Sequence, residues 1–222
     1  MLLRNKRAII FDLDGTLADT IGAIAEAVNM ALAKFSYPTR SEEEVRFAVG
    51  NGARMIVKRL MPEPDSLNDD KVTEVLECYD KMYALTYLHT TEMYDGIEET
   101  VRRLHDNGIK LAVFSNKQDA YVKGLVEQFF STGMISVARG QTDIPIKPDP
   151  AGTRIVLEEL GASADECVFV GDSGVDLKTA EKSGMDFIGV SWGFWGKERL
   201  SDAGAGIIVD RPCEMLNYLK LN

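Results

Sequence analysis

Six apolar runs of strand length recur along the chain, and they constrain its fold more than any other feature. The first is "RAIIF" at residues 7–11; the other five, all after residue 108, are "IKLAVF", "GMISVA", "CVFVG", "DFIGVS" and "AGIIVD". Each run is continuously apolar, which is typical of parallel strands buried on both faces. Helical segments between them end at Gly108, Gly161 and Gly184, where glycine suits the left-handed residue after a helix. The pattern predicts an α/β fold with a doubly wound parallel sheet.

Residues 18–90 interrupt this rhythm with helical patterns and contain no convincing strand. Ser41 and Glu44 have the spacing of a capping box, and "GNGA" and "PEPDS" separate further helical stretches. Apolar residues repeat at helical spacing at both ends of the segment: Leu17, Ile21, Ile24, Val28, Leu32 and Phe35, then Val72, Leu76, Tyr79 and Tyr83. The segment is too long for a loop. We therefore predict a small α-helical cap at 18–90, inserted into an α/β core of 1–17 and 91–222.

Composition limits the partners and the compartment. The 222 residues are 45% hydrophobic and carry a net charge of −10, which argues against nucleic acid or an anionic membrane as a partner. No stretch is long and uncharged enough to span a membrane, and the apolar run behind the basic leader is too short for a secretory signal. Three widely spaced cysteines fit neither a zinc site nor a disulfide framework. We expect a cytoplasmic protein, and the pattern does not decide between a monomer and a homodimer.

The first apolar run ends in "DLDGT", two acids spaced by one residue. This segment has three interpretations: a calcium loop, a solvated turn after a strand, or a carboxylate pair that does chemistry. A calcium loop of the EF-hand type needs glycine at its sixth position and glutamate at its twelfth. Counted from Asp12, glycine stands fourth and Ala23 stands twelfth, which excludes the calcium loop.

Polar residues also follow apolar runs at three later places. In an open parallel sheet, ligands bind outside the carboxyl ends of the strands, near the point where the strand order reverses. We therefore expect these polar residues to face one crevice together with "DLDGT". They are Ser115, Asn116 and Lys117 after "AVF", Lys147 in the proline-rich "IPIKPDP", and Asp172 and Asp176 in "GDSGVD".

Together these residues form a set suited to phosphoryl transfer. Asp12 can attack phosphorus as a carboxylate nucleophile, and Asp14 can protonate the leaving oxygen and then deprotonate water. Ser115 and Lys147 can bind the phosphoryl oxygens while charge is redistributed.

The remaining acids suit a metal ion. Asp12 and Asp172 offer hard oxygen ligands for Mg²⁺, and the backbone carbonyl of Asp14 is a third candidate. Asp176 can hold a metal-bound water, or it can be a favourable charge at a helix N-terminus. Without a cation and Lys147, the crowded carboxylates would repel each other and the substrate, so the set works only as a unit.

The four clusters, in their order, resemble those of the haloacid dehalogenase superfamily of phosphatases. "DLDGT" looks like the nucleophile motif of that family, and "SN", "KP" and "GDSGVD" look like its second, third and fourth motifs. The insert is similar to the family's small cap. Within the superfamily, "DGTLADT", "VGNGAR" and "GVSWGF" resemble the phosphoglycolate phosphatase group, whereas "ARGQTD" departs from the Gly-Gly-Asp-like segment found there.

The resemblance implies a Mg²⁺-dependent phosphomonoester hydrolase with an aspartyl-phosphate intermediate. Its implied substrate is a small phosphorylated metabolite, 2-phosphoglycolate first among the candidates, with the cap closing over the site and setting substrate choice. Trp192 and Phe194 are expected to pack the crevice wall. The candidate substrate-binding residues are Thr16, Asn116 and Lys117 in the core, and Gly50, Asn51, Gly52 and Arg54 in the cap. Arg54 can equally be a surface cation.

Other functions stay open at this point. A pyrophosphatase, a sugar-phosphate phosphatase or a β-phosphoglucomutase-like enzyme of the same superfamily would share both aspartates. A non-catalytic phospho-acceptor switch belongs to a different class, and Asp14 argues against it because an acid–base group at that position promotes turnover.

Overall fold

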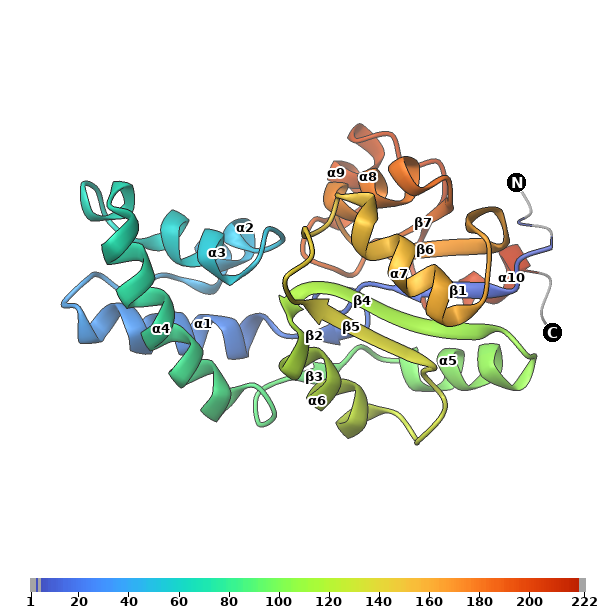
Figure 1. The fold of residues 1–222 in the computed structure, drawn as a ribbon, viewed down its shortest axis with the longest axis horizontal. Coiled ribbons are helices and arrows are strands. Elements are labelled where there is room, and N and C mark those ends of the chain that lie inside the picture. The colour runs from blue at the N-terminus through green and yellow to red at the C-terminus, as the bar shows by residue number, and fades with distance from the viewer. Residues whose placement is uncertain (1–2, 4, 220–222) are drawn as a thin grey trace. The chain divides into compact units, whose positions relative to one another are not determined.

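Six parallel strands form the central sheet of the protein, and each of them overlaps one of the six apolar runs (Figure 1). The computed structural model describes residues 3 and 5–219, so residues 1, 2 and 4 of the basic leader and 220–222 lie outside the described part. The strands are β1 (Ala8–Phe11), β4 (Lys110–Gln118), β5 (Val137–Gln141), β6 (Cys167–Gly171), β7 (Asp186–Val190) and β8 (Ile208–Val209). Their order is β5-β4-β1-β6-β7-β8. The predicted fold class is confirmed.

The strand order places β1 at the centre of the sheet. Ala8 is in register with Lys110 of β4 and with Cys167 of β6, and Phe11 is in register with Val113 and Val170. Counted along the chain, the six strands lie in the order 3-2-1-4-5-6, which reverses between β1 and β6. A ligand crevice is expected at the carboxyl ends of these two strands.

Both faces of the sheet are covered, which explains the unbroken apolar runs. Ile10 belongs to a buried cluster with Val156 of α7 (Pro150–Leu160) and Ala180 of α8 (Gly174–Ser183). Ile9 and Phe11 point to the opposite face because side chains alternate along a strand, and they are equally buried. The core thus sits on both sides of β1 and holds the strand ends in place.

Helices connect the strands and flank the sheet. Besides α7 and α8, they are α5 (Ile97–Asp106), α6 (Asp119–Phe129), α9 (Gly196–Asp202), α10 (Glu214–Leu219) and the short η2 (Ala164–Glu166). Gly108, Gly161 and Gly184 all have positive φ, as expected at the ends of α5, α7 and α8. None of the helices in the described part of the chain has the length and apolar character needed to cross a membrane.

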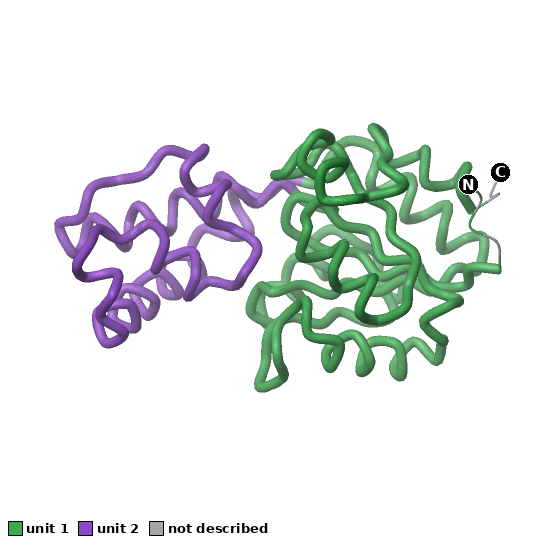
Figure 2. Tube along the Cα trace, turned by 90° about the horizontal axis from the view of Figure 1, so that it is seen from above, with its two compact units in different colours: residues 1–18, 93–222 green, residues 19–92 purple. Residues whose placement is uncertain are grey.

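A second compact unit comprises residues 19–92, and residues 1–18 with 93–222 form the first (Figure 2). It contains α1 (Ile21–Lys34), α2 (Glu42–Ala48), α3 (Ala53–Leu60), η1 (Asp65–Leu67) and α4 (Asp69–Thr86). The helix α1 packs against α4, and α3 packs against both α2 and α4. Ser41 and Glu44 form the expected capping box at the start of α2. That residues 18–90 act as a cap over the site stays a prediction.

Three local features differ from the sequence-based prediction. The two connections between the units each contain a two-residue strand, β2 (Ala18–Asp19) and β3 (Glu92–Met93), and these strands pair with each other. Such short strands carry no periodic signal. The strand β4 continues through Ser115 to Gln118, with a register shift between Phe114 and Gln118. The strand β5 begins only at Val137, and Gly133, with a φ of 87°, lies in the turn before it.

Candidate active site

Asp12 and Asp172 occupy equivalent places at the ends of the two central strands. Asp12 follows β1 directly, and its backbone N–H donates to the carbonyl of Val170 at 2.9 Å, so its main chain is fixed against β6. Asp172 follows Gly171, the last residue of β6. Both side chains are buried. The switch point of the sheet therefore places two carboxyl groups at the carboxyl ends of β1 and β6.

Lys147 supplies a buried positive charge beside these acids. Its Nζ lies 2.9 Å from Oδ1 of Asp12 and 2.7 Å from Oδ1 of Asp176, and only 2% of the side chain is exposed. The rings of Phe114 and Phe169 lie 5.9 and 5.3 Å from the ammonium group, within the range of cation–π attraction. Burial alone would lower the pKa of Lys147, but the two carboxylates outweigh it and raise that pKa.

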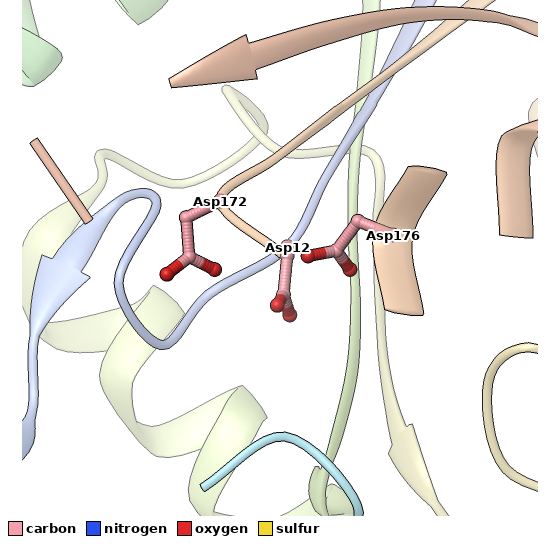
Figure 3. A group of neighbouring side chains, drawn as sticks. All are labelled: Asp12, Asp172 and Asp176. Atoms are coloured by element: carbon pink, nitrogen blue, oxygen red, sulfur yellow. The ribbon is translucent and has the colours of Figure 1, made fainter. Parts of the chain in front are cut away.

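Three aspartates share this small volume, as Figure 3 shows. One oxygen from each of Asp12, Asp172 and Asp176 lies within 4.8 Å of the others, and all three residues are buried. One lysine cannot balance three carboxylates, so the cluster holds an excess of negative charge. Burial, with repulsion from Asp176, raises the pKa of Asp12 from 3.8 to about 7. Burial and the same neighbour raise the pKa of Asp172 well above its usual value.

This donor set fits a divalent cation. Oxygen-only ligands suit a hard ion such as Mg²⁺, Ca²⁺ or Mn²⁺, and a divalent charge would offset the excess negative charge of the cluster. Among the described residues, this is the group of acids placed to hold a metal ion. The arrangement can therefore bind a divalent metal.

Asp176 owes its orientation to the start of α8. Ser173 caps this helix: its Oγ accepts from the N–H of Asp176 at 3.4 Å and donates to Oδ2 of Asp176 at 2.6 Å. This reciprocal arrangement leaves Oδ1 facing Lys147. Asp176 thus serves both as an N-terminal helix residue and as a member of the acid cluster. The spacing of Ser173 and Asp176 is a capping-box pattern that the sequence displays.

A glycine-rich loop after β7 holds Asp172. The backbone N–H of Phe194 donates to Oδ2 of Asp172 at 2.6 Å, so Phe194 contributes its main chain as well as its ring. A Cβ atom at Gly193 would overlap both Asp172 and the carbonyl of Gly15, and one at Gly15 would overlap the Asp172 carboxylate. Sequence reasoning assigned no role to Gly193; "WGFWG" was its only signal. Glycine is required here because three loops converge on one side chain.

The three consecutive polar residues of β4 have three different environments. The side chain of Asn116 accepts from the N–H of Lys147 at 2.7 Å and donates to its carbonyl at 3.1 Å, so it holds the main chain of Lys147. Lys117 contacts Asp14: its Nζ lies 2.7 Å from Oδ1. Ser115 is buried, and its Oγ accepts from the N–H of Lys117 at 3.3 Å.

Thr16 lies in the turn that follows Asp14. It is fully buried, and its hydroxyl has no hydrogen-bond partner within the described part of the chain. Its carbonyl accepts from Nε1 of Trp192 at 3.1 Å, which ties the turn to the loop after β7. The ring of Trp192 also lies 6.4 Å from that of Tyr94.

The candidate residues of the second unit are described by their contacts within that unit. Arg54 donates to Oγ1 of Thr73 at 3.0 Å and pairs with Asp69 at 3.1 Å, so its guanidinium is held within this unit. Gly50 and Gly52 have φ values of 116° and 81°, which favour glycine. Asn51 between them accepts from Arg59, at 2.8 Å. Arg59 also donates to the carbonyl of Ala48 at 2.8 Å, and sequence reasoning had not singled it out.

Comparison with known proteins adds a second line of observation. Residues 9–190 match the family described as haloacid dehalogenase-like hydrolase. Phosphoglycolate phosphatase 1 of Pseudomonas aeruginosa is 30% identical over 217 residues, which span 96% of this chain and 79% of that protein. The phosphoglycolate phosphatase of Yersinia pestis is 33% identical, over 97% of this chain and 94% of its own length. A crystal structure from Lactobacillus delbrueckii subsp. bulgaricus, of a protein thought to be a phosphoglycolate phosphatase, has a TM-score of 0.90 at 32% identity and covers 99% of both chains.

Proposed function

Because the chain belongs to the haloacid dehalogenase-like hydrolases and its curated relatives are phosphatases, we propose that it is a Mg²⁺-dependent phosphomonoester hydrolase acting on 2-phosphoglycolate. The observation that carries this proposal is the buried group of Asp12, Asp172, Asp176 and Lys147 at the switch point of the sheet. A nucleophilic carboxylate, a metal-binding acid cluster and a fixed cation are what a phosphoryl group needs.

The proposed reaction has two steps that share an aspartyl-phosphate intermediate. In the first, an oxygen of Asp12 bonds to phosphorus, the bond to the ester oxygen breaks, and Asp14 gives that oxygen a proton. In the second, Asp14 takes a proton from water while the water oxygen bonds to phosphorus and the bond to Asp12 breaks. The products are an alcohol and inorganic phosphate, and both aspartates return to their starting states.

The other site residues bind and orient in this scheme. Lys147 is buried beside Asp12 and is placed to attract a phosphoryl oxygen. Ser115 is proposed to donate to another phosphoryl oxygen. Asp12, Asp172 and the backbone carbonyl of Asp14 would hold Mg²⁺, with Asp176 acting through a water. When bound, the ion neutralises phosphoryl charge and lowers the repulsion among the carboxylates.

The choice of 2-phosphoglycolate as substrate is based on the named relatives rather than on the geometry of the site. Relatives matched over nearly the whole chain carry the name phosphoglycolate phosphatase, and 2-phosphoglycolate is therefore the first candidate. Selectivity is assigned to the helical cap and its loop at Gly50, Asn51 and Gly52, with Arg54 as a candidate contact to the substrate carboxylate. The positive-φ glycines give this loop a defined shape, which supports a role in selection.

The test is phosphate release by the purified protein, with Mg²⁺ and with EDTA. The panel comprises 2-phosphoglycolate, hexose and pentose phosphates, nucleoside monophosphates and pyrophosphate. We expect release that requires Mg²⁺, favours 2-phosphoglycolate and disappears in Asp12→Asn. The matched control is Asp143→Asn, which changes an exposed aspartate and should retain full activity.

Each other outcome redirects the proposal. Preference for pyrophosphate or a sugar phosphate would keep the chemistry and replace the substrate, and net transfer to a sugar hydroxyl would indicate a mutase. A long-lived phosphoenzyme without turnover would indicate a phospho-acceptor switch. Normal turnover by Asp12→Asn would mean that Asp12 is not the nucleophile. The cytoplasmic location stays a prediction.

A further inference from the structure

Lys117 forms an ion pair with Asp14. The Nζ of Lys117 lies 2.7 Å from Oδ1 of Asp14, and the exposed fractions of the two side chains are 6% and 12%. An ion pair this well shielded from water is held more firmly than one on the surface, where screening and side-chain entropy oppose it. The contact therefore restricts how the Asp14 carboxyl group can turn.

The backbone of β4 keeps Lys117 in place for this contact. Lys117 lies in the last part of the strand, within the stretch between Phe114 and Gln118 where the register with β5 shifts. Its N–H donates to Oγ of Ser115 at 3.3 Å. A Cβ atom at Gly140 of β5 would overlap the carbonyl of Lys117, so the neighbouring strand packs closely against its main chain. The main chain of Lys117 is thus held by Ser115 and by the close packing of β5.

Lys147 is buried and Lys117 is half-buried, and the two lysines contact different acids. Lys147 lies against Asp12 and Asp176, whereas the contact of Lys117 is with Asp14. The sequence pattern suggested that Lys117 binds the substrate. Its position suits a different task, because Lys147 already provides a cation next to the proposed nucleophile.

We propose that Lys117 is the positioning residue of the acid–base group: it holds the Asp14 carboxyl group facing the leaving oxygen and does not itself bind the phosphoryl group. This inference rests on the proposed function, in which Asp14 gives a proton from Oδ2 to the ester oxygen and later takes one from water, while Oδ1 accepts from Lys117 in both the protonated and the ionised form. Loss of the contact removes this restraint on the orientation of the Asp14 carboxyl group, and misplacement of a catalytic group by about 1 Å can cost about 100-fold in rate.

The chemistry of the leaving group distinguishes the two roles of Lys117. An alkoxide is a strong base and needs the proton from Asp14 as its bond to phosphorus breaks. The 4-nitrophenolate ion is a weak base and leaves without one. A residue that positions the acid matters for the first kind of ester only, whereas a residue that binds the phosphoryl group matters for both kinds equally.

The experiment compares Lys117→Met with the unchanged protein on two substrates. One is the alkyl phosphomonoester that the protein hydrolyses best, and the other is 4-nitrophenyl phosphate. The quantity compared is kcat/KM, because it reports the steps up to formation of the phosphoenzyme. We expect a fall of about 10- to 100-fold for the alkyl ester and a value within about threefold for 4-nitrophenyl phosphate. A burst of 4-nitrophenolate should precede slower turnover, because the second step also uses Asp14.

Two further variants keep the result interpretable. Lys117→Arg retains a cation that can bond to Asp14 and should restore a large part of the alkyl-ester activity. Lys123→Met is the matched control, since Lys123 pairs with Asp119 at 2.6 Å on α6, where its side chain is half exposed. Its kcat/KM should be unchanged on both substrates. Methionine replaces lysine with little change in volume, and a thermal melt within a few degrees of the unchanged protein confirms that Lys117→Met folds.

Equal falls of kcat/KM on both substrates would overturn the proposal, because they would indicate that Lys117 binds the phosphoryl group. An unchanged value on the alkyl ester would overturn it too. Failure of the proposed function looks different: the unchanged protein itself would then release no phosphate from any ester. If Lys117→Met does not fold, the deciding quantity is the ratio of kcat/KM for the alkyl ester to kcat/KM for 4-nitrophenyl phosphate in Lys117→Arg. The proposal fails if both kcat/KM values fall while this ratio stays equal to that of the unchanged protein.

Discussion

Replacing Asp12 by asparagine is expected to stabilise the metal-free protein while it abolishes turnover. Asp12 is buried beside Asp172 and Asp176, and burial with the neighbouring carboxylate raises its pKa from 3.8 to about 7. A shift of one pKa unit corresponds to about 1.4 kcal/mol, so the ionised carboxylate costs about 4 kcal/mol of folding free energy. Asparagine keeps an oxygen that accepts from Lys147 and from the N–H of Leu13, and it carries no charge.

The pH dependence of this cost has a definite sign. The folded protein binds the Asp12 proton more tightly than the unfolded chain does, so the cost is absent below about pH 4. It grows between about pH 4 and pH 7 and is constant above the folded-state pKa of about 7. The free energy of unfolding of Asp12→Asn should therefore exceed that of the unchanged protein by up to about 4 kcal/mol at pH 8, and by only about 1–2 kcal/mol at pH 5.

Thermal melting in EDTA at pH 5 and pH 8 measures the difference. In a protein of this size, about 1 kcal/mol corresponds to roughly 2–4 °C in Tm, so a gain of several degrees is expected at pH 8. Added Mg²⁺ should raise the Tm of the unchanged protein more than that of the variant, because a ligand of the folded state stabilises it by an amount that grows with the logarithm of its affinity. Asp143→Asn should change Tm at neither pH. This electrostatic argument would be refuted if the variant melted below the unchanged protein at pH 8. It would also be refuted if the gain in Tm were the same at pH 5 and pH 8.

Three further substitutions probe the groups around Asp12. Lys147→Met leaves the buried carboxylates without their cation, so it should lower stability in EDTA at pH 8 by about 3–5 kcal/mol, measured by the urea midpoint, and by less at pH 5. Gly193→Ala places a methyl group against Asp172, and the Mg²⁺ concentration for half-maximal activity should rise about 10-fold or more. Asn116→Leu removes both hydrogen bonds to the main chain of Lys147, so kcat/KM should fall equally for alkyl and 4-nitrophenyl esters. This differs from the result expected for Lys117→Met. A fall confined to alkyl esters would contradict the role of Asn116 in holding Lys147.

The sequence predicted the fold because its signals are local. A strand buried on both faces has to be apolar at every position, so the six runs could be read directly, and each became a strand of one parallel sheet. Helix ends could be predicted equally well, because the capping box at Ser41 and the C-terminal glycine Gly161 depend on residues within one helical turn. The two-residue strands β2 and β3 were missed because two residues carry no period.

Which side chains meet in the site was beyond the reach of such signals. The order of motifs predicted that polar strand ends share an edge, but not that Lys147 lies between Asp12 and Asp176. The contribution of the Phe194 main chain to Asp172 was not predicted either, since any residue offers the same N–H.

The sequence by itself thus determined the parallel sheet and the acids at its strand ends, since both follow from the hydrophobicity of neighbouring residues. The tertiary structure alone decided the partners: Lys117 contacts Asp14, and Asn116 holds Lys147 across 31 residues of chain. These contacts depend on sheet order, on a register shift in β4 and on loops packed so closely that only glycine fits. Such distances arise only when the whole core is assembled, because no local preference fixes how far apart two strand ends lie.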